Sequence, residues 1–185
     1  EMCIRDRVAG ALIWKWVLSP EYGAINNILA LFGIEGPSWL QSSKWAMPAI
    51  VLASVWKDMG YFGLMLMSGL QGINQEYYDA AAIDGAGKIK QFTRITLPLL
   101  TPTLFFVLII SLINSFQLFT QIMIMTPDGG PLGSTMVMVE RIYKCGFRYY
   151  EMGTAAAYSW ILFAILLLLT MVQMKLQNKW VNYDD

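Results

Sequence analysis

Long apolar stretches separated by polar segments run through most of the chain. Residues 46–72 and 153–174 each reach the roughly 20 predominantly apolar residues that a helix needs to cross a bilayer. Residues 95–127 carry no charge and form the longest uncharged window in the sequence. We therefore predict three complete membrane-spanning helices, at 46–72, in the first part of 95–127, and at 153–174.

A shorter apolar segment precedes them at residues 8–18, interrupted only by Lys15. Its 11 residues are too few to cross a bilayer. We interpret it as the last part of a fourth span whose beginning is missing; the alternative is an interfacial helix anchored by Trp14 and Trp16. Residues 1–7, EMCIRDR, resemble translated adapter sequence at the end of a fragmentary gene model, and we exclude them as non-native.

Two polar segments predict loops. Residues 19–45 are rich in Gly, Pro and Asn, which are typical of loops, and contain one short amphipathic stretch at 25–32 that fits a helix on the membrane surface. Residues 126–153 predict a second loop. Within it, residues 134–150 alternate apolar and charged side chains at helical spacing. This pattern indicates an amphipathic helix, either at the membrane surface or packed on a partner outside the membrane.

Charged side chains in the first long stretch need a partner, because a charge is costly at membrane depth. Lys57 and Asp58 fall in the middle of residues 46–72. They are candidates for a gate or a translocation path. The alternatives are a charge buried against a neighbouring helix or a helix break near Gly60.

Three amides occur in the second half of the uncharged window. Asn114, Gln117 and Gln121 have the i, i+3 and i+7 spacing that places them on one face of a helix. Amides in lipid need hydrogen-bond partners. We therefore expect this face to meet either a water-filled translocation path or another helix.

Composition supports a membrane protein and excludes several kinds of chemistry. The 185-residue chain is 56% hydrophobic and 14% charged, with a mean hydropathy of +0.48, whereas soluble domains carry about 25% charged residues. The net charge is zero, so there is no basic footprint for nucleic acid. His is absent and the two cysteines, Cys3 and Cys145, are far apart. The sequence therefore offers no catalytic residue set, no metal site and no sign of a membrane enzyme.

A third polar segment occupies residues 73–98. Asn74 is a typical helix N-cap, and acidic residues follow it in the first turns, where the helix dipole favours them. Three alanines at 80–82 favour helix and leave a flat face, and Gly85 and Gly87 supply a C-terminal stop. A flat helix face of this kind fits a groove on another protein; an ordinary connecting loop that favours helix is the alternative.

The remainder of this segment leads into the next span. Residues 88–96 predict a second short helix with Ile89, Phe92 and Ile95 on one face. Pro98 then marks the entry into the span, because the residue before a proline is disfavoured in helical geometry. The segment therefore predicts a helix, a glycine turn and a second helix.

The same segment resembles the EAA motif of the permease subunits of binding-protein-dependent ABC importers. That motif reads Glu-Ala-Ala, three residues, Gly, nine residues, Ile, one residue and Leu-Pro. The chain matches every spacing with Asp79, Ala80, Ala81, Gly85, Ile95, Leu97 and Pro98. Asp79 replaces the usual Glu, which keeps the charge and shortens the side chain, and Glu76 lies one turn earlier.

Other stretches are similar to the carbohydrate-uptake branch of that family, which includes maltose-type and glycerol-3-phosphate-type permeases. They lie at residues 11–26, 66–73 and 126–138. The resemblance covers nearly all of residues 8–185. We expect these residues to be the C-terminal part of one importer transmembrane domain, an all-α, polytopic membrane fold with a cytoplasmic coupling helix.

The resemblance also implies partners and an orientation. The 73–98 loop would be cytoplasmic and would dock in a cleft of a cytoplasmic ABC ATPase dimer; that partner binds the ATP, and the permease itself holds no cofactor. A second homologous permease subunit and an extracytoplasmic solute-binding protein would complete the importer in a bacterial or archaeal inner membrane. The C-terminus would be cytoplasmic, and the other two loops would lie on the opposite side.

Candidate docking residues are the motif positions and the acidic residues beside them: Glu76, Asp79, Ala80, Ala81, Asp84, Gly85, Ile95, Leu97 and Pro98. The candidates for the translocation path are Lys57, Asp58, Asn114, Gln117 and Gln121. We expect ATP-coupled uptake of a sugar, a related polyol or a glycerol phosphate by alternating access. The alternative is a secondary transporter or channel subunit that works without an ATPase, for which only the Lys57–Asp58 pair argues.

Overall fold

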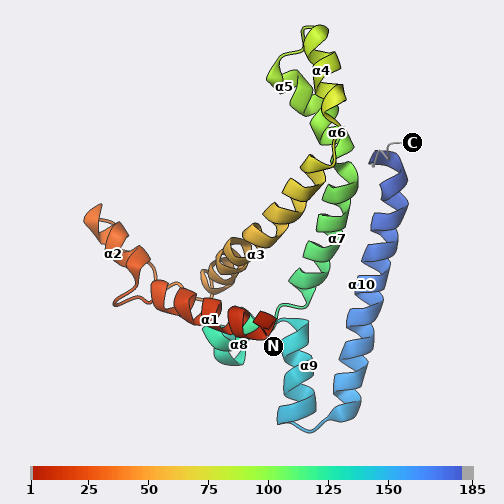
Figure 1. The fold of residues 1–185 in the computed structure, drawn as a ribbon. Coiled ribbons are helices and arrows are strands. Elements are labelled where there is room, and N and C mark those ends of the chain that lie inside the picture. Colours follow the sequence, from red (N-terminus) through yellow and green to blue (C-terminus); the bar gives the residue numbers. More distant parts are fainter. Residues whose placement is uncertain (1, 181–185) are drawn as a thin grey trace. The chain divides into compact units, whose positions relative to one another are not determined.

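A computed structural model describes residues 2–180, and every regular element in that range is a helix (Figure 1). The all-α class is therefore confirmed for the described residues. The elements are α1 (Met2–Val17), α2 (Ala24–Leu31), α3 (Ala46–Gln71), α4 (Gln75–Ile83), α5 (Lys88–Gln91), η1 (Phe92–Thr96), α6 (Leu97–Leu99), α7 (Thr101–Phe116), α8 (Thr120–Met125), η2 (Pro127–Gly129), η3 (Pro131–Gly133), α9 (Met138–Tyr143), η4 (Lys144–Arg148) and α10 (Met152–Trp180). Residue 1 and residues 181–185, which include the expected cytoplasmic C-terminus, lie outside the described range.

Two helices among the described residues are long and apolar enough to cross a membrane. They are α3, Ala46–Gln71, and the Met152–Gln177 part of α10, each 26 residues long. At 1.5 Å per residue a helix of that length covers about 39 Å, more than the roughly 30 Å of a bilayer's hydrocarbon core. A third crossing depends on a bent pair, Lys88–Leu99 with Thr101–Phe116, whose axes differ by 62°. The predicted third span is thus a broken helix.

Two prolines explain where this helix breaks. Pro98 has no N–H to donate, and the turn before it widens into the π-helical η1, in which the N–H of Leu97 bonds to the carbonyl of Phe92. Pro102 likewise cannot donate to the carbonyl of Pro98. The Thr101 hydroxyl donates to that carbonyl instead, at 2.6 Å. The bend therefore leaves this carbonyl hydrogen-bonded.

Residues 2–180 divide into two compact units. The first comprises residues 2–58 and 116–163, and the second comprises residues 59–115 and 164–180. The core of the first unit lies where α1 meets α8, and Leu18, Ile50 and Ile122 are fully buried there. The second unit contains the 73–98 segment and the helices on either side of it.

The short helix expected at 25–32 is confirmed as α2. Asn26 ties the helix to the segments on both sides of it. Its side-chain oxygen accepts from the Trp39 indole N–H at 2.7 Å, and its side-chain nitrogen donates to the carbonyls of Pro20 and Pro37. Apolar side chains at the end of the helix remain exposed, with Leu31 at 85%.

α1 is a helix, as expected for residues 8–18, but its 16 residues do not make a complete span.

Two further expectations need correction. The helix predicted at 134–150 begins only at Met138 and ends at Arg148, as α9 followed by the π-helical η4. Its charged residues do not all face solvent, because Glu140 and Lys144 are buried. The break considered near Gly60 is absent, since α3 runs through that position without interruption.

Candidate functional site

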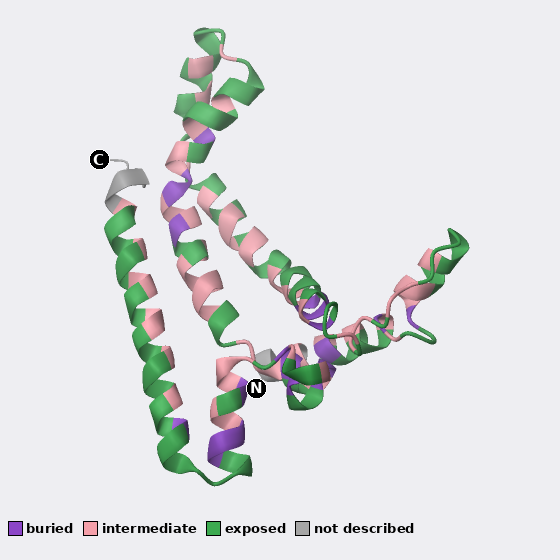
Figure 2. Cartoon of the chain, turned by 180° about the vertical axis from the view of Figure 1, so that it is seen from behind, coloured by how far each residue is buried: buried purple, intermediate pink, exposed green. Residues whose placement is uncertain are grey.

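We call residues 73–98 the polar hairpin, because α4 and the α5–η1 helix form its two arms. The arms meet at a turn around Gly85 and project beyond the ends of α3 and α7 (Figure 1). Most of its residues are exposed, and buried positions appear only where it joins α7 (Figure 2). The predicted order of helix, glycine turn and second helix is confirmed.

The first arm begins with a capped helix. The Asn74 side-chain oxygen accepts from the backbone N–H of Glu76 at 3.1 Å, which satisfies one of the free donors at the start of α4. The Asn74 side-chain nitrogen donates to a Glu76 carboxylate oxygen at 3.2 Å. The predicted N-cap is therefore confirmed, and it holds the Glu76 carboxylate at the positive end of the helix dipole.

α4 ends in a motif that needs glycine. Gly85 has φ of +73°, a left-handed conformation that other residues adopt only with strain. The N–H of Gly85 bonds to the carbonyl of Ala82 at 3.0 Å, and the N–H of Ala86 bonds to that of Ala81 at 2.9 Å. These two bonds satisfy the last carbonyls of the helix and turn the chain toward the second arm.

Two side-chain contacts hold the arms together. The Tyr78 hydroxyl on α4 lies 2.8 Å from the hydroxyl of Thr96 on η1, which is buried. The Gln91 side-chain nitrogen donates to the carbonyl of Ala86 at 3.0 Å, so α5 is tied back to the turn. The hairpin therefore closes most of its hydrogen bonds within itself.

The candidate docking residues lie on or beside the surface of this hairpin. Those that are exposed are Glu76, Asp79, Ala80, Asp84, Gly85 and Leu97; those that are partly buried are Ala81, Ile95 and Pro98. Sequence reasoning missed Ile83, which is 88% exposed at the end of α4; Ile89, on α5 after the turn, is 83% exposed. The sequence signal that could have identified Ile83 is its position as an apolar residue directly after the alanines at 80–82.

The three amides do not share one helix face. Asn114 lies on α7, which ends at Phe116, and Gln117 is an exposed turn residue after it. Gln121 lies on the separate helix α8 and is buried at 3% exposure, with its side-chain oxygen lacking a hydrogen-bond partner. The expectation of one continuous polar stripe is therefore wrong, because the helix stops between the second and the third amide.

Lys57 and Asp58 pair with each other. The Lys57 ammonium lies 2.7 Å from an Asp58 carboxylate oxygen, and both side chains are partly buried. Pairing neutralises the two charges inside α3, which lowers the cost of placing them in a membrane helix.

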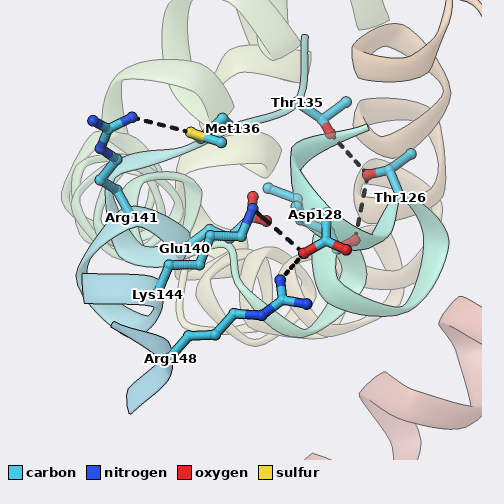
Figure 3. A network of polar contacts seen from close by, with 9 residues as sticks. Thr126, Asp128, Thr135, Met136, Glu140, Arg141, Lys144 and Arg148 are labelled. Carbon is cyan, nitrogen blue, oxygen red and sulfur yellow. Dashed lines mark hydrogen bonds and ion pairs between the residues drawn. The ribbon is translucent and has the colours of Figure 1, made fainter. Parts of the chain in front are cut away.

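A cluster of charges that sequence reasoning missed lies in the second loop. Lys144 is buried, with its ammonium 3.0 Å from Glu140 and 3.8 Å from Asp128 (Figure 3). Arg148 donates to Asp128, and this hydrogen bond, with the charge of Arg148, holds the pKa of the Asp128 carboxyl below its usual range. The i, i+4 spacing of the first pair was visible in the sequence, but its burial was not.

The hydroxyls of Thr126 and Thr135 close the loop beside this cluster. They are 2.9 Å apart and both residues are buried. Asp128 adopts a left-handed conformation between them, with φ of +64°. The ion pairs of the charged cluster and the contact between the two threonines hold residues 126–148 together. Among the described residues, no three His, Cys, Asp or Glu side chains converge on a metal position.

Comparison with known proteins gives one family and several relatives. The family model described as "Binding-protein-dependent transport system inner membrane component" matches residues 5–183. The chain is 35% identical over 184 residues to the "Probable ABC transporter permease protein YesP" of Bacillus subtilis strain 168, covering 98% of this chain and 59% of that protein. It is 38% identical over 165 residues to the sulfoquinovosyl glycerol transport system permease protein SmoG of Agrobacterium fabrum, covering 89% of this chain and 53% of SmoG.

A third relative and a solved structure agree with this. The sn-glycerol-3-phosphate transport system permease protein UgpA of Shigella flexneri is 36% identical over 174 residues, which cover 94% of this chain and 59% of UgpA. The chain thus spans between 53% and 59% of the length of these relatives. A crystal structure of a bacterial ABC transporter involved in the import of the polysaccharide alginate matches with a TM-score of 0.84, at 24% identity over 94% of this chain and 60% of that one. This likeness concerns the fold alone.

Proposed function

Since the chain belongs to the family of inner membrane components of binding-protein-dependent transport systems, we propose that it works as the permease subunit of an ABC importer. The proposed cargo is a sugar, a related polyol or a glycerol phosphate, in line with the substrates in the names of SmoG and UgpA. The permease carries no ATPase activity of its own, and a partner subunit binds and hydrolyses the ATP.

The observation that carries the proposal is the polar hairpin. Its motif residues lie on a capped helix and on the helix that returns from it, outside the packed parts of the chain. Ile83, Ile89 and the acidic positions Asp79 and Asp84 are exposed on it. A short helix with exposed apolar and acidic groups is suited to insertion in a groove of another protein. We assign that groove to a cytoplasmic ABC ATPase dimer.

Coupling then follows from the way the hairpin is attached. ATP binding closes the ATPase dimer and moves the docked hairpin. The hairpin passes this motion to α3 on one side and to the α6–α7 pair on the other, because it is continuous with both. A second permease subunit supplies the other half of the pathway, and the two alternate between outward-open and inward-open states. An extracytoplasmic solute-binding protein delivers the cargo.

The proposed orientation places the polar hairpin and the C-terminus in the cytoplasm. Residues 19–45 and 126–153 then face the extracytoplasmic side. The break between α7 and α8 brings Gln117 to the surface of the chain, and its neighbours Asn114 and Gln121 flank that break. We propose these amides as groups that contact a hydroxyl-rich cargo, since interrupted helices offer free polar groups at membrane depth.

One experiment tests docking and coupling together. The full-length permease is purified with its ATPase and binding protein, and ATP-driven uptake is measured in proteoliposomes for the Asp79→Ala, Gly85→Val double variant. We expect co-purification of the ATPase to fall and uptake to be lost. Normal assembly and normal ATP-coupled uptake in this variant would overturn the docking role.

A matched control is available on another polar segment. The Glu35→Ala, Gly33→Val double variant changes the same kinds of residue in the 19–45 loop, where Gly33 also has a positive φ, of 71°. We expect it to keep the ATPase bound. Uptake by the wild-type protein that continued after ATP depletion with a proton gradient intact would instead support an ATPase-independent carrier.

A further inference from the structure

Gly69 of α3 lies against α7 near the base of the polar hairpin. A Cβ atom on Gly69 of α3 would lie 2.5 Å from the Thr103 hydroxyl oxygen and 2.9 Å from the Thr103 Cβ on α7. It would also lie 2.9 Å from a methyl group of Leu100. Atoms that are not bonded to one another pack at roughly 3.5–4 Å. A larger residue at this position therefore requires Thr103 and Leu100, or the helix that carries them, to shift away from α3.

Other glycines of α3 show that the crossing is specific. Gly60 and Gly63 lie in the same helix, and a Cβ at either would meet no atom within 4 Å among the described residues. Glycine is a poor residue for a helix interior compared with alanine. Gly69 therefore has a packing reason that is particular to its contact with Thr103.

The crossing lies at the base of the hairpin. Gly69 precedes the N-cap Asn74 by five residues, and Thr103 follows Pro98 by five residues. In Figure 1, α7 and the second half of α3 approach each other there and separate with distance from the hairpin. Leu100, at the break between α6 and α7, is buried beside this contact.

This position matters because the second arm is bent. The helix axis turns by 62° between Leu99 and Thr101, and a bend is the place where a push on the hairpin could be absorbed without moving α7. A contact two residues after the bend restrains the start of α7, because Thr103 there rests against Gly69 of α3. The motion of the hairpin is then passed to both helices together.

We propose that Gly69 is a positioning residue for coupling, which locks α3 and α7 into one moving body through its contact with Thr103. The proposal rests on the proposed function, because it names the element that carries motion from the docked hairpin into the membrane. It does not assign Gly69 any contact with cargo or ATP.

The test measures the distance between the two helices in the assembled importer. Spin labels are placed on cysteines at Leu64 of α3 and Leu108 of α7, which are 70% and 41% exposed, after Cys3 and Cys145 are replaced by serine. The label-to-label distance is recorded without nucleotide and in the vanadate-trapped state. A second pair of labels, at Lys90, which is exposed on the hairpin and is not one of the proposed docking residues, and on the ATPase, reports whether the hairpin is docked.

We expect the α3–α7 distance in the wild type to be the same in both nucleotide states. In Gly69→Val the label-to-label distance between α3 and α7 should change between the two states by more than about 2 Å, the size of ordinary helix shifts in switching proteins. The two helices should then no longer move together when ATP drives the hairpin. Gly63→Val, on the same helix, should behave as the wild type does. A constant distance in Gly69→Val, or a nucleotide-dependent distance in the wild type, would overturn the proposal.

A size-exchange variant guards against misfolding of Gly69→Val. Gly69→Ala should loosen the crossing, and Gly69→Ala combined with Thr103→Gly should restore it, because the small residue then lies on the other helix. Failure of the double variant to recover the wild-type distances would count against the contact. Loss of ATPase docking in the wild type would refute the proposed function instead, so the two failures can be told apart.

Discussion

The hydroxyl oxygens of Tyr78 and Thr96 lie 2.8 Å apart and join the two arms of the polar hairpin. The Tyr78→Phe variant removes this bond from a buried partner, and we expect it to cost about 1 kcal/mol of local stability. Hydrogen exchange of the α4 amides should then become roughly fivefold faster. Tyr77→Phe is the matched control, since Tyr77 is 45% exposed. Equal exchange in the two variants would contradict the role of the contact.

The Gly85→Ser substitution should weaken ATPase binding more than the Gly87→Ser substitution does. Gly85 has φ of +73°, so a side chain there is strained by roughly 1–2 kcal/mol. Gly87 precedes α5 with φ of −66°, which serine adopts freely, and serine is a good N-cap. We expect Gly85→Ser to weaken ATPase binding by about tenfold, and Gly87→Ser to leave it within a factor of about two. Binding is measured by titration of the purified partners.

Low pH should loosen the second loop at Asp128. The hydrogen bond from Arg148 lowers the pKa of Asp128 in the folded state. The stability that the ionised Asp128 gives to the fold is therefore fully present at a pH above the ordinary aspartate pKa of about 3.9. It is lost as the pH falls through the lowered folded value. Hydrogen exchange of residues 127–148 should therefore accelerate in acid. Asp128→Asn should show that faster exchange at every pH, and Asp84→Asn should leave the profile unchanged.

Removing Lys144 should destabilise the protein more than removing Arg148. Lys144→Met leaves Glu140 buried without its cation, and breaking a buried pair costs about 3–5 kcal/mol. The Arg148 side chain is 56% exposed, so solvent screens its ion pair with Asp128 and the pair contributes less to stability. The midpoint of thermal unfolding reports both. The Lys144→Met, Glu140→Leu double variant should be more stable than Lys144→Met alone.

Cysteines at two of the amides should label at different rates. Gln117 is exposed in the turn after α7, whereas Gln121 is buried on α8. We expect Gln117→Cys to react with a small water-soluble maleimide at least about tenfold faster than Gln121→Cys in the absence of nucleotide. If the amides line the path, cargo should slow labelling at Gln117→Cys. Labelling that does not respond to cargo would remove that residue from the pathway.

The polar hairpin was predictable because its signals are local. Asn74 caps the helix that follows it, and Gly85 ends the same helix, so each needs only its immediate neighbours. The motif spacing then identified the segment without any knowledge of packing. The sequence also predicted α3 and α10, whose apolar length alone sets them apart.

The break between α7 and α8 was not predictable in the same way. Residues 117–119 contain neither Gly nor Pro, so no local signal stops the helix. Ile122 and Met125 of α8 are buried in the core of the first unit, which contains α1 and the start of α3. Contacts with residues distant in sequence therefore outweigh local helix preference. The burial of Glu140 and Lys144 has the same kind of origin, because Asp128 comes from a separate turn.

The self-contained hydrogen bonding of the polar hairpin has an evolutionary consequence. Its N-cap, its glycine turn and its two inter-arm contacts all come from residues within 26 consecutive positions. Such a module can be exchanged between related permeases without rebuilding the helices that it joins. On the function proposed here, the motor that a transporter accepts and the cargo that it selects are encoded in separate parts of the chain, and each can change while the other is kept.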